Sequence, residues 1–175
     1  MGNKDVQITH SPLDRIAYGY RDRVSIPTLE RTGINLRDVE KLLQTLIRGL
    51  PDAMQPLRYR RKDKPSLQFD NEYDVQDLIH LLLKPWIKDV RKEAYTPSYV
   101  GSSTRVDFLL ADYDIVIEVK YVRDNTHAKK IGDELIIDIA HYRVLPQCKK
   151  LWIVIYDPMK HLQNPGGLIS DLKSL

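Results

Sequence analysis

The sequence has almost no cysteine and no long hydrophobic run. Its one cysteine, Cys148, excludes an internal disulfide, and no set of cysteine and histidine residues has the spacing of a structural zinc site. The longest apolar runs, around residues 81–83 and 135–140, are far too short to span a membrane. The first residues lack the basic and apolar segments of a signal peptide. We therefore expect a cytoplasmic protein that has no membrane segment.

A strong excess of one charge is also absent. The formal net charge is only +3 over 175 residues, so the whole-chain balance excludes no class of partner. The length and the 42% hydrophobic content suit one globular domain with its own core. Basic residues gather locally, between residues 58 and 64, in a run that includes Arg60, Arg61 and Lys62. This run is either a solvated loop or part of a surface for a phosphodiester substrate.

Hydrophobic periodicity and turn residues predict the order of the elements. Residues 1–34 show no clear period and are assigned to an irregular N-terminal arm, and residues 35–175 to a mixed α/β domain. The predicted elements are a helix over 36–50 ended by Pro51, a helix from residue 70 or 71 with an apolar stripe reaching Trp86, strands over 93–100, 104–110 and 115–121, a helix over 129–145, a strand over 151–156 buried on both faces, and a last helix ending at residue 175.

The hairpin over residues 104–121 brings two acids and a lysine together. A tight, symmetric turn centred on residues 112 and 113 pairs Leu110 with Ile115, which places Asp107 opposite Glu118. Because side chains alternate along a strand, Lys120 shares the face of both acids, while the other face of the second strand is apolar. The Cβ atoms of the two acids are then about 5 Å apart, with the lysine about 7 Å along from Glu118. A three- or five-residue turn would change this register.

Two carboxylates that face each other within apolar strands destabilise a hairpin. A divalent cation between them removes this repulsion, and Mg²⁺ typically takes one or two carboxylates together with waters and phosphate oxygens. Such an ion lowers the pKa of a bound water, and Lys120 would position that water, help to deprotonate it or offset charge in the transition state. The alternative is a salt bridge between Lys120 and Glu118 on a solvated face. The apolar surroundings of the acids favour the metal site.

Several segments resemble a known nuclease family. The pair Val106-Asp107, followed by Glu118 and Lys120, resembles the PD-(D/E)XK nuclease motif, with valine in place of the proline in the family's name. Residues 71–78, 96–99, 103–108, 131–139, 156–158 and 164–165 resemble the DpnII/MboI-type restriction endonuclease-like family. This resemblance implies a restriction endonuclease-like fold. Its central mixed β-sheet is flanked by helices in the core order αβββαβ, here with an N-terminal helical extension.

The resemblance also implies roles for individual residues. The expected catalytic and metal-binding residues are Asp107 and Glu118 as metal ligands, the carbonyl of Val119 as a third ligand, and Lys120 as the catalytic lysine. Many such nucleases add an acid from the first core helix. Glu72 is the first candidate because it shares the stripe of Val75 and Ile79, and Asp77 is the second. The alternative role for both is to complement the helix dipole.

Further polar residues are candidates for contact with nucleic acid. Arg105 shares the face of Asp107 and is a candidate phosphate ligand, and Ser102 and Ser103 are candidate donors to a backbone phosphate. Their alternative roles are those of a surface cation and of turn residues. The basic run that contains Arg60, Arg61 and Lys62 completes the predicted contacts.

One polar stripe has three possible environments. Glu134, Asp138 and Tyr142 recur at helical spacing, and they face the active site, a partner subunit or solvent. The helix over 36–50 similarly forms either a dimer surface or a cover for the core of a monomer.

These features predict a metal-dependent endonuclease that acts on DNA, with double-stranded DNA as the expected substrate. The cofactor is Mg²⁺, for which Mn²⁺ can substitute. The resemblance implies bacterial restriction or antiphage defence, with a fused or associated sensor module in some members. Because cutting both strands needs two sites, we expect a homodimer or a larger assembly. The alternatives are a structure-specific nickase, a resolvase or an RNase on the same fold, or a non-catalytic nucleic-acid-binding subunit.

Overall fold

The computed structural model describes residues 7–10, 17–20, 35–95 and 105–174. The chain divides into two compact units, Met1–Ile34 and Asn35–Leu175. In the first unit, β1 (Gln7–His10) pairs antiparallel with β2 (Ala17–Tyr20). The prediction of an irregular arm is therefore wrong at these two strands. Four residues per strand are too few for their alternation to stand out as a period in the sequence.

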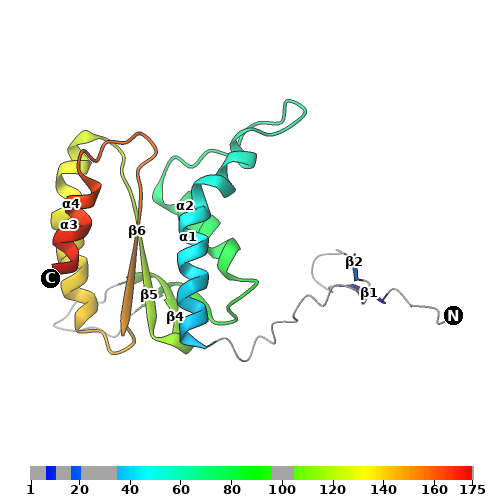
Figure 1. Ribbon diagram of the computed structural model, residues 1–175, viewed down its shortest axis with the longest axis horizontal. Coiled ribbons are helices and arrows are strands. Elements are labelled where there is room, and N and C mark those ends of the chain that lie inside the picture. Colours follow the sequence, from blue (N-terminus) through cyan, green and yellow to red (C-terminus); the bar gives the residue numbers. More distant parts are fainter. Residues whose placement is uncertain (1–6, 11–16, 21–34, 96–104, 175) are drawn as a thin grey trace. The chain divides into compact units, whose positions relative to one another are not determined.

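The second unit has three layers, with one sheet between two pairs of helices (Figure 1). The sheet has the order β3-β4-β5-β6. Its strands are β3 (Val90–Tyr95), β4 (Arg105–Leu110), β5 (Ile115–Tyr121) and β6 (Lys150–Tyr156). The first three are antiparallel, and β6 runs parallel to β5 after a crossover through α3 (Asn125–Arg143). The predicted mixed sheet and its αβββαβ order are confirmed.

Helices α1 (Leu36–Arg58) and α2 (Glu72–Leu83) cover one face of the sheet, and α3 and α4 (Pro165–Ser174) cover the other (Figure 1). On the first face, Ile117 of β5 lines a small apolar cavity together with Leu43 of α1 and Ile79 of α2. On the second face, Val116 packs with Leu109 and with Tyr142 of α3. None of the helices among the described residues combines the length and apolarity needed to cross a membrane.

Helix α1 (Leu36–Arg58) continues through Pro51 and Pro56, so the prediction that Pro51 ends it is wrong. The helix bends toward its C-terminal end (Figure 1). Its apolar stripe continues beyond the proline, because Leu50 is 4% exposed and Met54 is 1% exposed. Burying a side chain such as Met54 contributes about 1.5–3 kcal/mol, which offsets most of the roughly 3 kcal/mol that an interior proline costs.

The apolar stripe of α1 is buried within its own domain. Val39 and Leu43 are fully buried, as are Leu50 and Met54 farther along. This face of α1 therefore covers the core of its own domain.

The remaining described helices and strands differ from their predictions mainly at the ends. The strand predicted over 93–100 corresponds to β3 as far as Tyr95, and residues 96–100 lie outside the described residues. Helix α2 stops at Leu83, before Pro85, and Trp86 is 41% exposed while Ile87 takes a core position at 1% exposed. Strand β6 has one buried residue, Val154, although its sequence is apolar. It was predicted to be buried on both faces, and it is instead the last strand of the described sheet. An edge strand leaves one side of its backbone uncovered, so its side chains are less enclosed.

Replacing Pro51 with alanine should raise the free energy of unfolding by about 1–2 kcal/mol. Alanine restores a backbone N–H and removes the ring clash, a gain of roughly 3 kcal/mol in a helix interior. The added freedom of the unfolded chain removes about 1 kcal/mol of this gain. Urea denaturation monitored by circular dichroism measures the change, with Asp52→Ala as the control at the neighbouring exposed position. A less stable Pro51→Ala protein would show that the bend itself is needed for packing.

Candidate active site

The turn between β4 and β5 sets the register of the site. Four residues connect the strands, and Ala111–Tyr113 form a 3₁₀ turn that closes at Asp114, whose φ is 53°. This turn pairs Leu110 with Ile115, as predicted. The same count places Asp107 opposite Glu118.

Asp107 lies where the backbone pairing of the sheet is interrupted. The β4–β5 ladder ends at the pair of Phe108 with Ile117, one position before Asp107. On the other side of β4, the pairing with β3 keeps one register throughout, but Glu93, the residue of β3 that faces Asp107 in this register, has no pair. The φ of Glu93 is 53°, which is unusual for a non-glycine residue. In place of a ladder bond, the Val119 N–H donates to Asp107 Oδ2 at 2.7 Å. The carboxylate is therefore bound to the backbone of β5 at the end of the β4–β5 ladder.

Glu118 is the acid across from Asp107, and it is 6% exposed. Its Oε1 lies 2.7 Å from the Nζ atom of Lys120. Its Oε2 accepts a hydrogen bond from the hydroxyl of Tyr142 on α3. The Lys120 ammonium lies between two carboxylates, because Asp138 Oδ2 of α3 is 2.9 Å from the same Nζ atom. Both oxygens of Glu118 thus have partners within the protein.

Helix α3 faces this cluster with part of its polar stripe. Asp138 and Tyr142 contact Lys120 and Glu118, which is the first of the three environments that the sequence left open. Glu134, one turn earlier, lies 3.3 Å from Nε2 of His127. Spacing alone revealed the stripe, but its partners depend on how α3 packs on β5.

The electrostatics of the cluster show an excess of negative charge. Burial, and then the charge of Glu118, raise the pKa of Asp107 from its ordinary value of 3.8 to about 7, although the Val119 N–H lowers it. Burial also raises the pKa of Glu72, while the charge of Lys120 lowers it. Burial is the main cause of both shifts and neighbouring carboxylates add to it, and a cation bound beside these acids would offset both effects.

Lys120 and Tyr142 both keep their protons in this environment. Burial lowers the pKa of Lys120, but its hydrogen bonds and charge interactions with Glu118 and Asp138 raise it by more, so the pKa is raised overall. Burial, and then the charge of Glu118, raise the pKa of the Tyr142 hydroxyl. Lys120 is therefore an ammonium group at neutral pH, and Tyr142 is a neutral hydrogen-bond donor.

Glu72 reaches the same region from α2. Asn71 caps this helix in a capping box with Asp74, which fixes Glu72 as the first helical residue. A cavity of about 270 Å³ opens beside it, lined by Asn71, Glu72, Tyr73, Lys120, Tyr121, Arg123, His127 and Glu134. Asp77, the second candidate from α2, is exposed and forms an ion pair with Lys92 at 2.5 Å. Only Glu72 of these two acids shares a cavity with Lys120.

The predicted nucleic-acid contacts that the structure describes are not among the residues that line this cavity. Arg105 is exposed and is 3.4 Å from Glu93 Oε1. Arg60, Arg61 and Lys62 are exposed in the loop after α1. Ser102 and Ser103 lie outside the described residues.

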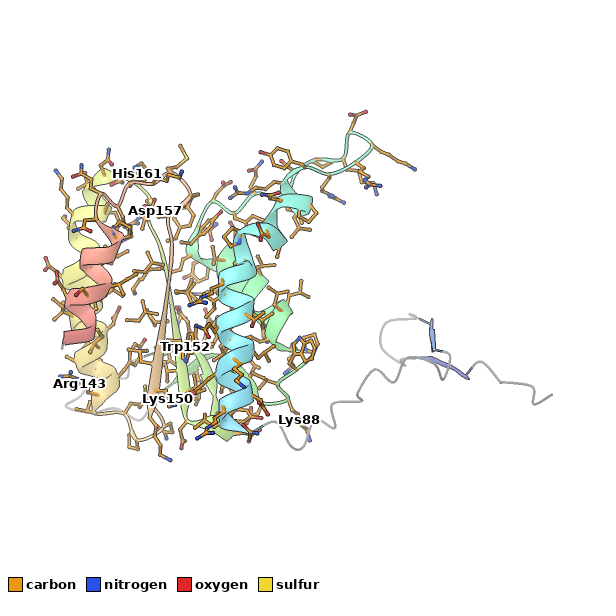
Figure 2. All side chains as sticks on the ribbon, viewed as in Figure 1. Lys88, Arg143, Lys150, Trp152, Asp157 and His161 are labelled. Atoms are coloured by element: carbon orange, nitrogen blue, oxygen red, sulfur yellow. The ribbon has the colours of Figure 1, made fainter. Side chains whose placement is uncertain are left out.

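The end of the sheet that holds the cavity can be followed in the figures. The loop after α1 lies at this end, where β5 and β6 finish and α3 starts (Figure 1). In Figure 2, Asp157 and His161 mark this end and Lys150 marks the opposite one. His161 Nδ1 is 3.0 Å from Asn125 Oδ1, which connects the loop after β6 to the start of α3.

Three residues near the site were missed by the sequence reasoning. Arg123 and His127 line the cavity, just after the end of β5. Gln76 follows Glu72 by one helical turn and is 2% exposed, and its Oε1 has no hydrogen-bond partner within the described part of the chain. The four-residue spacing from Glu72 is the sequence signal that could have drawn attention to Gln76.

The raised pKa of Asp107 predicts a pH dependence of the protein without bound metal. A carboxyl pKa of about 7 means that the folded chain holds a proton that the unfolded chain loses from about pH 4. Stability should therefore fall as pH rises from about 4 to 7, by at most about 4 kcal/mol and by less because the side chain is partly exposed. Urea denaturation in chelator across this range, compared with Asp107→Asn, measures the contribution. Equal pH profiles for the two proteins would contradict it.

One comparison identifies the family of the chain. A sequence model of the DpnII-MboI restriction endonuclease family matches residues 41–175. No curated protein matches the chain significantly, and no solved structure does so. The family match includes the whole cluster of Glu72, Asp107, Glu118 and Lys120, and it confirms the resemblance found in the sequence. The chain therefore belongs to the DpnII-MboI family of restriction endonucleases.

Proposed function

We propose that the chain is a divalent metal-dependent endonuclease that hydrolyses double-stranded DNA in bacterial restriction or antiphage defence. Residues 35–175 would form the nuclease domain. The supporting observation is the cluster of Asp107, Glu118 and Lys120 at the interruption of the sheet, with Glu72 beside it. Family membership supports the class of reaction, and the chemistry of these side chains supports the mechanism.

The donor atoms of the cluster fit a hard divalent cation. Carboxylate oxygens of Asp107 and Glu118 are the ligands that Mg²⁺ prefers, and the raised pKa of Asp107 reflects a charge that such a cation would offset. The described residues contain no group of three or more Asp, Glu, His or Cys side chains placed to hold a metal. Mg²⁺ is ordinarily held by one or two carboxylates plus waters and substrate phosphate. Asp107 and Glu118 would hold the ion, with the Val119 carbonyl as a further ligand and Glu72 nearby.

Each residue then has a distinct task. A bound cation would supply a water of lowered pKa and would stabilise charge on the phosphate. Lys120, as an ammonium group, orients a nucleophile and offsets negative charge in the transition state rather than accepting a proton. Tyr142 fixes the orientation of the Glu118 carboxylate by donating to its Oε2. Glu72 contributes negative charge at the mouth of the cavity that Lys120 lines.

Basic residues around this end of the sheet would bind the DNA backbone. Arg123 lines the cavity, and the exposed Arg60, Arg61 and Lys62 lie in the loop at the same end of the sheet (Figure 1). One chain carries one such cluster, so cutting both strands would require two copies, and we propose a dimer on the DNA. Linear plasmid formed without a nicked intermediate would support this assembly, whereas nicked circles alone would support the alternative of a nickase.

Cleavage should depend on a divalent cation. Supercoiled plasmid should be cut with Mg²⁺ or Mn²⁺, and Ca²⁺ should support binding without cleavage, because Ca²⁺ activates water less effectively and tolerates looser geometry. Agarose gels resolve the products, with linear DNA and RNA as parallel substrates to separate the DNase and RNase alternatives. Cleavage that continues in excess chelator would exclude the metal mechanism. Absence of cleavage with every substrate would favour the non-catalytic binding subunit.

Removal of the lysine or the buried acid should abolish cleavage without unfolding the chain. Lys120→Ala removes the ammonium that offsets transition-state charge, and Glu118→Gln removes a metal ligand while leaving an acceptor for the Tyr142 hydroxyl. We expect at least about a 100-fold loss of cleavage rate for each variant. Lys41→Ala, at an exposed position of α1, is the control for loss of a positive charge. Wild-type rates in Lys120→Ala or Glu118→Gln would show that the cluster is structural.

A further inference from the structure

Helix α3 places two polar side chains, one turn apart, on the cluster of β5. Tyr142 is 3% exposed and donates its hydroxyl proton to Glu118 Oε2. Asp138 holds the ammonium of Lys120 at 2.9 Å. Tyr142 therefore contacts Glu118, and Asp138 contacts Lys120. Glu118 and Lys120 are neighbours on the same face of β5.

This arrangement creates a conflict for any cation at Glu118. Both oxygens of Glu118 are engaged, Oε1 by Lys120 at 2.7 Å and Oε2 by Tyr142. Each carboxylate oxygen has two acceptor sites, but the Lys120 ammonium at Oε1 repels a cation that binds the same carboxylate, so direct binding of a cation favours movement of the ammonium away from Glu118. Tyr142 is buried, and among the described residues its hydroxyl donates to Glu118, so losing this bond would leave a buried donor unpaired. Lys120 already has a second carboxylate within reach.

We propose that Asp138 is a positioning residue that retains the Lys120 ammonium when Glu118 binds a divalent cation. This inference rests on the proposed metal-dependent function. Asp138 acts through Lys120 and need not touch the ion or the substrate. It gives Lys120 a partner that does not compete with the cation, and it keeps the ammonium beside the reacting phosphate.

The burial of the pair explains why the second carboxylate matters. The side chains of Lys120 and Asp138 are 15% and 22% exposed, so water screens their attraction only in part. Without Asp138, Lys120 would either remain on Glu118 and compete with the cation or stay partly buried without a counter-charge. Both outcomes weaken metal binding, and the second also releases the ammonium from its position.

Metal affinity, measured without any cleavage, tests the proposal. Binding of Mn²⁺ to the full chain is followed by electron paramagnetic resonance of the free ion. Asp138→Asn should raise the dissociation constant about 10-fold or more, which is the usual effect of losing a residue that orients a metal ligand. Asp138→Glu restores the counter-charge and should stay within about threefold of the wild type. Asp133→Asn removes an exposed carboxylate of the same helix and controls for the change in net charge.

A double-mutant cycle shows whether Asp138 acts through Lys120. In a Lys120→Met background no ammonium competes for Glu118, so Asp138→Asn should change the Mn²⁺ dissociation constant less than about twofold. An equal loss of affinity in both backgrounds would overturn the proposal, since Asp138 would then bind the ion itself or act by charge alone. Thermal melting by circular dichroism confirms that each variant is folded, and Asp138→Ser provides a second truncation.

The same data separate this inference from the proposed function. If the wild type binds Mn²⁺ and Asp107→Asn abolishes that binding, the metal site stands, and unchanged affinity in Asp138→Asn overturns only the role of Asp138. If the wild-type chain binds no Mn²⁺, or if Asp107→Asn binds it equally well, the proposed metal site fails and the inference fails with it.

Discussion

The hydrogen bond from the Val119 N–H to Asp107 Oδ2 connects the backbone of the sheet to the chemistry of the site. At this point the β4–β5 ladder has ended, and a side chain takes the hydrogen bond that a backbone carbonyl would accept in a continuous sheet. The Val119 amide is therefore satisfied by a side chain and not by the backbone of the neighbouring strand. The acid is consequently held by the fold itself. The position of Asp107 therefore depends on β5. The other side of β5 is bound to β6 by seven parallel residue pairs, which fix the register of β5.

The neighbouring carboxylates of Asp107 and Glu118 repel each other, and this repulsion lowers the stability of the domain unless other interactions offset it. Glu118 is buried and Asp107 is partly buried, and burial together with the charge of Glu118 raises the pKa of both Asp107 and the Tyr142 hydroxyl. The partly compensating charge is Lys120, which is shared between Glu118 and Asp138. Because burying unpaired charge is unfavourable, the surrounding apolar residues supply the stability that the cluster lacks. Val106, Leu109 and Val116 form such a cluster directly beside it.

The sequence determined the local part of this arrangement well. Periodicity and the four-residue turn were sufficient to place β5 at Ile115–Tyr121 and to pair Leu110 with Ile115, because strand alternation and turn length are local properties. Pro51 was misjudged because the burial of Met54, which keeps α1 helical, depends on distant parts of the fold. Strand β6 was misjudged for the same reason, since whether an apolar strand is central or at the edge depends on the sheet order and not on its own residues.

The partners within the site were the least predictable feature, and Tyr142 shows why. Its ring belongs to the apolar cluster with Val116 and Leu145, while its hydroxyl bonds to Glu118. In the sequence, Tyr142 lies on a polar stripe of the helix, which predicts a polar environment, but its aromatic ring is typical of a core. The sequence does not decide between these environments, because the answer depends on how α3 packs on β5. In the structure they are compatible, because a tyrosine can bury its ring and still direct its hydroxyl at a carboxylate. The packing of α3 therefore sets the orientation of Glu118, so that the same contact contributes to the stability of the domain and to the geometry of the site.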